Sequence, residues 1–260
     1  MRTLILGDIH SNWWALQAAV AAAGAVDRVL CTGDLVDYGP APRRCVEWVR
    51  EHAERTVRGN HDHAVAQHVP SVGDTGLRAV AAHARNRQWE ELTPELLRYL
   101  ARLPVCETFD LDGRETLMVH GSPRDPLDDY APADPAGWGD RLVGITAELV
   151  LVGHTHAPYL IQAERPGGGM TTVLNPGSVG QPRDGDPRAA YALIEAGEIT
   201  LHRAEYDPTP AVEALRECGL PHEVMETAEA LLRTGRRPSA RGGAVRGPRS
   251  SVGAAAICPG

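Results

Sequence analysis

Residues 3–37 read TLILGDIHSNWWALQAAVAAAGAVDRVLCTGDLVD, and this stretch decides the fold. Its segments 3–6 and 28–31 are nearly continuous in apolar or β-branched residues, a pattern typical of strands buried on both faces. Between them, 12–23 is rich in alanine, follows Ser11 as an N-cap and stops at Gly24, which predicts a helix. This alternation of strand and helix indicates a layered α/β architecture.

The same pattern continues along the chain. Further strands are predicted at 56–57, 116–119, 149–152 and 171–174, and a helix at 42–52. Residues 74–103 predict two helices, the second beginning at Thr93-Pro94, and we expect them to form a helical insertion beside the sheet. A hairpin is predicted from 191–195 and 199–206 around Gly197-Glu198, followed by short helices at 210–218 and 222–234.

The length of 260 residues, 43% of them hydrophobic, suits one large domain or two small ones. From 236 onward the chain consists mostly of Arg, Gly, Pro, Ser and Ala, a composition that cannot bury a core. We therefore expect one domain over 1–235 and a disordered tail over 236–260.

The charge of the chain is unevenly distributed. The formal net charge is −8, yet residues 1–232 carry 20 Arg against 34 Asp and Glu, a balance of −14. An acidic body disfavours a broad contact with nucleic acid, so the Arg-rich tail is the part suited to such a partner. The chain has no Lys, which excludes Schiff-base chemistry and phosphate loops that need a Lys.

The five Cys are widely spaced and form no CxxC motif, so neither a disulfide framework nor a Cys-based zinc site is expected. The N-terminal apolar run is too short for a signal peptide, and no stretch approaches the roughly 18 apolar residues of a membrane span. We therefore expect a cytoplasmic protein without a membrane partner.

Five of the predicted strands are followed by residues that can bind metals. They are Gly7-Asp8-Ile9-His10, Gly33-Asp34-Leu35-Val36-Asp37, Gly59-Asn60-His61-Asp62, His120-Gly121 and Gly153-His154-Thr155-His156. A single DxH or HxH is a weak signal and more often a surface or capping feature. Ligands of open α/β sheets bind at the carboxyl ends of strands. The occurrence of all five motifs directly after strands therefore predicts one shared site.

The residue types at these strand ends favour divalent metals. Imidazole, carboxylate and amide oxygen together suit Mn, with Fe, Co, Ni and Zn also compatible, and the absence of thiolates argues against structural zinc. Seven ligands are too many for one ion but suit two ions that share a carboxylate. Two such ions about 3.5–4 Å apart clamp the attacking and leaving oxygens of a phosphoryl displacement and acidify a bridging water.

In this order the five motifs resemble those of the calcineurin-like metallophosphoesterases, over about residues 1–205. The segment 175–180, Asn-Pro-Gly-Ser-Val-Gly, also resembles the small bacterial phosphodiesterase branch of that superfamily. The resemblance implies a four-layer α/β/β/α sandwich with two mixed sheets. In this chain we expect the helical insertion in addition to these layers.

The resemblance also assigns roles to the site residues. It implies that Asp8, His10, Asp34 and His156 bind one metal, and that Asn60, His120 and His154 bind the second, with Asp34 bridging both. His61 would face the substrate, where it can protonate the leaving alkoxide or stabilise charge on the phosphoryl oxygens. Asp62 would orient His61 through its other ring nitrogen.

One departure from the superfamily is informative. Protein Ser/Thr phosphatases carry GDxxDRG, whose Arg touches the substrate phosphate, whereas this chain has Tyr38 at that position. A phosphoprotein phosphatase is therefore disfavoured. Arg124, Arg183 and Arg188 are the candidates for contact with the substrate anion instead.

These patterns predict a hydrolase that cleaves phosphodiesters of small-molecule or nucleotide type by attack of a metal-bridging hydroxide, with monoesters and cyclic nucleotides as further substrates. One alternative is a dinucleoside polyphosphate hydrolase, because small bacterial relatives include such activities. A non-catalytic interaction scaffold is the other, because the fold also occurs in a retromer subunit; the complete set of ligands argues against it. Nucleic acid stays open as a substrate, and the pattern leaves the oligomeric state open.

Overall fold

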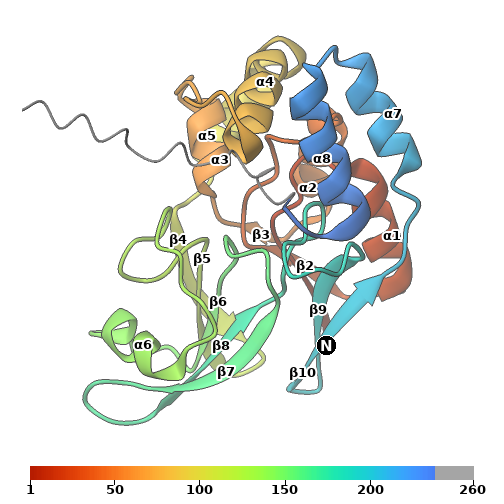
Figure 1. Ribbon diagram of the computed structural model, residues 1–260. Coiled ribbons are helices and arrows are strands. Elements are labelled where there is room, and N and C mark those ends of the chain that lie inside the picture. Colours follow the sequence, from red (N-terminus) through yellow and green to blue (C-terminus); the bar gives the residue numbers. More distant parts are fainter. Residues whose placement is uncertain (238–260) are drawn as a thin grey trace, which may run out of the picture.

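The computed structural model describes residues 1–237. In this part of the chain the strands form two five-stranded sheets, ordered β10-β9-β1-β2-β3 and β4-β5-β6-β8-β7 (Figure 1). The first sheet contains β1 (Arg2–Leu6), β2 (Arg28–Cys31), β3 (Arg55–Thr56), β9 (Ala189–Glu195) and β10 (Glu198–Ala204). The second contains β4 (Cys106–Leu111), β5 (Arg114–Val119), β6 (Leu149–Leu151), β7 (Tyr159–Glu164) and β8 (Met170–Asn175).

Both sheets are mixed, as predicted. In the first, β1, β2 and β3 are parallel, β9 is antiparallel to β1, and β10 is antiparallel to β9 at the edge. In the second, β5, β6 and β8 are parallel, and β4 and β7 are antiparallel edge strands. The parallel strands of each sheet therefore end along one common edge, which is where the side chains after them can meet.

Helices cover the outer faces of the two sheets. They are α1 (Trp13–Ala23), α2 (Pro42–His52), α3 (Asn60–Ala66), α4 (Gly76–Glu91), α5 (Pro94–Arg102), α6 (Pro135–Gly139), α7 (Thr209–Glu217) and α8 (His222–Thr234), with a 3-10 turn at Asp140–Leu142. Along β1, Leu4 and Leu6 pack under helices α1, α2, α3 and α5, whereas Ile5 faces the second sheet. The alternation produces the predicted order of four layers, α/β/β/α.

The insertion predicted at 74–103 consists of two helices with different neighbours. Leu96 and Leu100 of α5 are buried in the core above the first sheet. Ala79 and Val80 of α4 instead pack with Tyr38 and the apolar faces of α7 and α8. The inserted helix α4 is therefore held between the C-terminal helices and the loop that follows β2.

Some local predictions need correction. The N-cap of α1 is Asn12, whose side chain accepts from the amide of Ala15 at 3.2 Å, and not Ser11, whose φ of 54° lies in the left-handed region. Strands β4 and β7 and the short helices α3 and α6 were not expected.

Within the described residues, no helix is both long and apolar enough to cross a bilayer. The boundary expected at 235 and 236 stays a prediction. Positions 238–260 of the expected tail lie outside the described residues.

Candidate metal centre

The ends of five strands from both sheets converge on one buried cluster. Asp8 follows β1, Asp34 follows β2 and Asn60 begins the helix after β3. From the second sheet, His120 follows β5 and His154 lies shortly after β6. Asp8, Asp34 and His120 are fully buried, and His10 and His156 are 1% exposed. The side chains that the sequence predicted to share a site are therefore brought together at the facing edges of two sheets.

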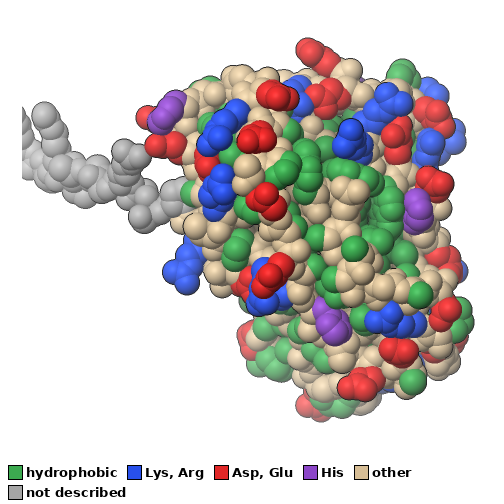
Figure 2. Space-filling model, turned by 90° about the vertical axis from the view of Figure 1, so that its right-hand side faces the viewer, with side chains coloured by type: hydrophobic (Ala, Val, Ile, Leu, Met, Phe, Trp, Pro, Cys, Tyr) green, Lys and Arg blue, Asp and Glu red, His purple; other side chains and the backbone are tan. Residues whose placement is uncertain are grey.

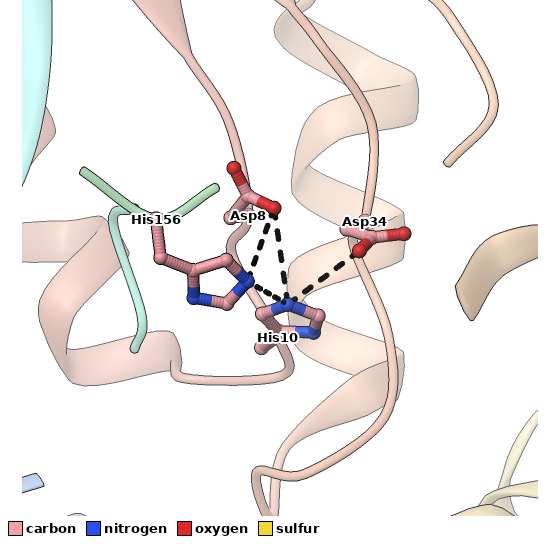
Figure 3. Close-up of side chains that lie close together, drawn as sticks. All are labelled: Asp8, His10, Asp34 and His156. Carbon is pink, nitrogen blue, oxygen red and sulfur yellow. Dashed lines mark hydrogen bonds and ion pairs between the residues drawn. The ribbon is translucent and has the colours of Figure 1, made fainter. Parts of the chain in front are cut away.

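Four of these residues form a first group that could hold a metal ion (Figure 3). His156 Nε2 lies 3.3 Å from Asp8 Oδ1 and 3.1 Å from His10 Nε2. His10 Nε2 lies 3.6 Å from Asp34 Oδ2. Ligand atoms bound about 2.0–2.2 Å from one ion are roughly 3–4.4 Å apart, so this spacing suits a single ion held by all four residues.

A second group, formed by Asp34, His120 and His154, shares Asp34 with the first. His120 Nε2 lies 3.2 Å from Asp34 Oδ2, and the rings of His120 and His154 are 5.0 Å apart. Asn60 adjoins this group, because the amide of the next residue, His61, donates to Asp34 Oδ1 at 2.9 Å. One carboxylate between two groups of ligands is the arrangement expected of a dinuclear centre.

Three of the histidines are oriented by a backbone carbonyl on the opposite side of the ring. Nδ1 of His10, His120 and His156 lies 2.8, 2.8 and 2.5 Å from the carbonyl oxygens of Val36, Thr32 and Gln181 respectively. A carbonyl can only accept, so each Nδ1 carries a proton and each Nε2 is the nitrogen that faces the cluster. Metal-ligating histidines are oriented in this way.

The cluster also contains polar atoms that lack partners. Within the described residues, Asp34 Oδ2, Asn60 Oδ1 and His120 Nε2 are buried and make no hydrogen bond. Buried polar atoms nearly always make a hydrogen bond. Three neighbouring atoms without one therefore indicate that a ligand binds here. The donor set of imidazole, carboxylate and amide oxygen fits a divalent cation.

Burial makes the charges of this cluster costly in the protein alone. It raises the pKa of Asp8 to about 7, the nearby Asp34 carboxylate acting in the same direction. Burial also lowers the pKa of His156 well below its usual value, and the charge of Arg183 lowers it further. A neutral imidazole is the form that binds metal, and a divalent cation would relieve the crowding of two buried carboxylates.

The backbone of the cluster is strained. Eleven non-glycine residues in the described chain have a positive φ, and five of them are cluster residues: Asp8, His10, Asp34, His154 and His156. Such conformations cost about 1–3 kcal/mol each and persist only where the surroundings enforce them. Strain concentrated on these five positions is a second, independent indication that they form a functional site.

Close packing at Gly59 shapes the cluster. A Cβ at Gly59 would lie 2.0 Å from Asp34 Oδ1, although its φ of −84° would suit any residue. Only glycine lets the chain before Asn60 pass this close to the shared carboxylate.

The segment 175–180, noted in the sequence only for its resemblance, supports the two strand-end loops. Ser178 Oγ donates to the carbonyl of Asp8 at 2.7 Å, and Asn175 Nδ2 donates to the carbonyl of Gly153 at 2.6 Å. The motif therefore fixes the loops that carry Asp8 and His154 through its two polar side chains, Asn175 and Ser178.

His61 lies beside the first group, but its partner differs from the prediction. Its Nδ1 lies 2.6 Å from Asp37 Oδ2, and its ring centroid is 5.0 Å from that of His10. Asp62, expected to orient His61, instead accepts from the backbone amides of Asp34 and Leu35, both at 2.8 Å. Asp62 points back from the first turn of α3 to the loop after β2, so it positions Asp34 rather than His61.

Asp37 is in turn held by two buried side chains of α4. Arg85, 6% exposed, donates through Nε to Asp37 Oδ2 at 3.1 Å and through Nη1 to the carbonyl of Val69. Gln88, fully buried, accepts from the amide of Asp37 at 2.8 Å through Oε1. The inserted helix therefore orients His61 through Asp37. No pattern near Arg85 or Gln88 in the sequence points to this role.

The three Arg residues predicted to contact substrate differ in position. Arg124 and Arg188 lie at the surface in ion pairs with Asp129 and Asp186, at 3.3 and 2.7 Å. The amide of Arg183 donates to the carbonyl of His156 at 3.2 Å, and its guanidinium lies 5.7 Å from the centroid of the Tyr38 ring. Arg183 is thus the candidate that contacts the residues of the metal site, and the substrate role of all three stays a prediction.

Comparisons with known proteins agree with this site. A family model described as the calcineurin-like phosphoesterase superfamily domain matches residues 1–198. An uncharacterised protein of Methanocaldococcus jannaschii is 30% identical over 244 residues, which cover 84% of this chain and 93% of that protein. The crystal structure of a metallophosphoesterase from Sphaerobacter thermophilus is 37% identical, with a TM-score of 0.76 over 90% of this chain and 99% of that one.

A shorter similarity connects the chain to an enzyme of named activity. The symmetrical bis(5'-nucleosyl)-tetraphosphatase of Yersinia pestis is 34% identical over 123 residues, which cover 42% of this chain and 39% of that enzyme. The match of the family model over most of the chain, together with the structural likeness, shows that this protein belongs to the calcineurin-like phosphoesterase superfamily.

Proposed function

We propose that this protein is a dinuclear metal-dependent phosphoesterase that hydrolyses phosphodiesters, with monoesters and cyclic nucleotides as further substrates. The observation that carries the proposal is the pair of ligand groups that share the buried Asp34. Two divalent ions at these residues would supply Lewis acidity and an activated water for an in-line displacement at phosphorus.

The protein's own residues have separate tasks in this proposal. Asp8, His10 and His156 hold one side of the centre, and Asn60, His120 and His154 hold the other. His61, beside the first group, supplies the proton to the leaving alkoxide. Burial alone would lower the pKa of His61, but the carboxylates of Asp34 and Asp37 outweigh it and raise the pKa. A raised pKa favours the protonated form of His61, which is the form that an acid requires.

We propose Mn as the native metal. The ligand groups found in the described residues contain imidazole and carboxylate but no thiolate. Such hard-to-borderline ligands suit Mn, with Fe, Co, Ni and Zn also compatible, and the lack of thiolates disfavours a structural zinc. Four cysteines are free in the described chain, which fits the reducing cytoplasm that we propose for this enzyme.

A second candidate is a dinucleoside polyphosphate hydrolase. The similarity of 123 residues to a bis(5'-nucleosyl)-tetraphosphatase favours it. The two candidates use the same centre and differ in which phosphate esters are preferred. An interaction scaffold would not require the complete set of ligands that this chain carries.

We propose small-molecule or nucleotide esters rather than nucleic acid as the partner. On the face shown in Figure 2, basic side chains are interspersed with acidic ones and form no single broad patch. The formal net charge of −8 also repels a polyanion.

Hydrolysis of bis(p-nitrophenyl) phosphate with added Mn tests the proposal. Wild-type protein should hydrolyse the diester, Asn60→Ala should abolish most of this activity, and His61→Ala should lower it. Full activity in both variants would overturn the proposed mechanism. Diadenosine tetraphosphate cleaved far faster than the model diester would favour the second candidate.

A further inference from the structure

An open pocket of about 720 Å³ lies beside the segment that carries His154 and His156. Tyr130, Arg183, Asp184, Gly185, Arg236 and Arg237 line it. Sites for small molecules occupy about 300–1,000 Å³, so the pocket can hold a substantial part of a ligand. Three of its six lining residues are Arg, in a chain whose formal net charge is negative.

Two residues that line the pocket, Tyr130 and Arg183, contact the segment that carries His154 and His156. The amide of Arg183 donates to the carbonyl of His156 at 3.2 Å. The ring of Tyr130 lies 5.9 Å from that of His154, and its hydroxyl donates to the carbonyl of Thr155 at 3.4 Å. These contacts therefore connect the lining of the pocket to the segment that carries two of the predicted metal ligands.

The guanidinium of Arg183 has unused donors. It lies against the Tyr38 ring, and Nη2 donates to Gln181 Oε1 at 2.7 Å. Its Nε is buried and makes no hydrogen bond with any described residue. Because a guanidinium carries five N–H donors, several remain for an anion in the pocket.

A backbone contact between Gly185 and Gly235 positions Arg236 beside the pocket. Gly235 caps helix α8 in the left-handed conformation, with φ 62°, and the amide of Gly185 donates to the carbonyl of Gly235 at 3.0 Å. A Cβ at Gly185 would lie 2.9 Å from Arg236 Nε, so the side chain of Arg236 lies along this glycine. The end of α8 and the loop after β8 thus form one wall.

The acidic residues of this loop do not neutralise the pocket. Asp184 forms an ion pair with Arg203, and Asp186 forms one with Arg188. Within residues 1–237, Arg183, Arg236 and Arg237 have no acidic ion-pair partner. The pocket therefore retains an excess of positive charge that an anionic ligand would complement.

We propose that the pocket is a second anion subsite, in which Arg183 and Arg236 hold a phosphate of the substrate other than the one being hydrolysed. The preferred substrates are then esters with two or more consecutive phosphates, the chemistry of nucleoside di- and polyphosphates. This inference rests on the phosphoesterase function proposed above.

The test compares how tightly wild type, Arg236→Gln, Arg236→Lys and Arg233→Gln bind AMP and ADP. Arg233 is a matched control, because it lies on the last turn of α8 and pairs with Glu229 instead of lining the pocket. The inhibition constants of AMP and ADP are measured against hydrolysis of bis(p-nitrophenyl) phosphate with Mn. Arg236 is exposed, so its substitution leaves the core intact.

Wild type should bind ADP about tenfold more tightly than AMP, a gain expected of one additional charge-assisted contact. Arg236→Gln should lose most of this gain, Arg236→Lys should keep part of it, and Arg233→Gln should keep all of it. An equal gain in Arg236→Gln and Arg233→Gln would overturn the inference.

A protein that fails to hydrolyse the diester refutes the proposed function instead. Calorimetric titration of the same variants with AMP and ADP in the presence of Mn then tests the subsite directly. No difference between the two nucleotides in wild type would overturn the inference independently of catalysis.

Discussion

His61 Nδ1 lies 2.6 Å from Asp37 Oδ2, and this contact connects the proposed acid to the loop that also carries Asp34. Asp37 is fully buried, and its carboxylate is shared between His61 and the guanidinium of Arg85. The proton and the orientation of His61 therefore depend on residues from the loop after β2 and from α4, and the first three predictions follow from this arrangement.

Replacement of Asp37 by Asn should lower kcat without removing the metals. General acid catalysis contributes about 10²–10⁴-fold, and His61 remains present, so a loss of about 10–100-fold is expected. The loss should be larger for a phenyl or alkyl leaving group than for p-nitrophenolate, which departs with less need for a proton. An equal loss for all leaving groups, with full metal content, would show that Asp37 does not act through the acid.

The pH dependence of the same variant gives a separate test. In wild type the pKa of His61 is raised because the carboxylates of Asp34 and Asp37 outweigh the effect of burial. The protonated acid is present below that pKa and is lost as the pH rises through it. Asp37→Asn removes one of the raising charges, so the descending alkaline limb of kcat/KM should move to lower pH. If the alkaline limb does not move, it reports the titration of a group other than His61.

Arg85 should act as a positioning residue. Arg85→Gln leaves the buried Asp37 carboxylate without its cation, and breaking a buried pair costs about 3–5 kcal/mol in the free energy of unfolding. It should also reduce kcat most with poor leaving groups, as Asp37→Asn does. Arg85→Lys keeps the positive charge but lacks the planar guanidinium with its paired donors. It should therefore be less impaired than Arg85→Gln in both stability and kcat. Denaturant unfolding and leaving-group series on the two variants check this, and a loss of stability with unchanged kcat would refute the role.

Gly59→Ala should abolish metal binding, since the added Cβ would collide with Asp34 Oδ1. Gly139→Ala is the matched control, because its φ is −51° and the nearest heavy atom to its Cβ is 3.7 Å away. Metal analysis after dialysis against Mn should find little metal in the first variant and wild-type content in the second. Normal content in Gly59→Ala would contradict the close packing described here.

The sequence predicted the parts of the fold that have strong local patterns. Buried parallel strands such as β1 and β2 read as continuous apolar runs and were found. Strands β4 and β7 lie at the edges of the second sheet, where exposed and covered residues alternate, so their runs are interrupted. Helix α3 is only seven residues long, too short for a helical periodicity to emerge.

The metal ligands of the candidate site could be predicted because they directly follow predicted strands. All seven expected ligands lie where the strand ends converge. The partner of His61 was not predictable, because Asp62 is adjacent in sequence whereas Asp37 comes 24 positions earlier. The left-handed backbone at Asp37, with φ 64°, and the packing of α4 decide that contact, and neither can be read from a local pattern.

The central claim is that two metal ions bound around Asp34 are needed for phosphodiester hydrolysis. The most direct measurement adds Mn stepwise to protein stripped with a chelator and follows the rate of bis(p-nitrophenyl) phosphate hydrolysis. Our account predicts no activity without metal and a rate that saturates when two ions are bound per chain. Activity in the stripped protein, or saturation at a single bound ion, would contradict it.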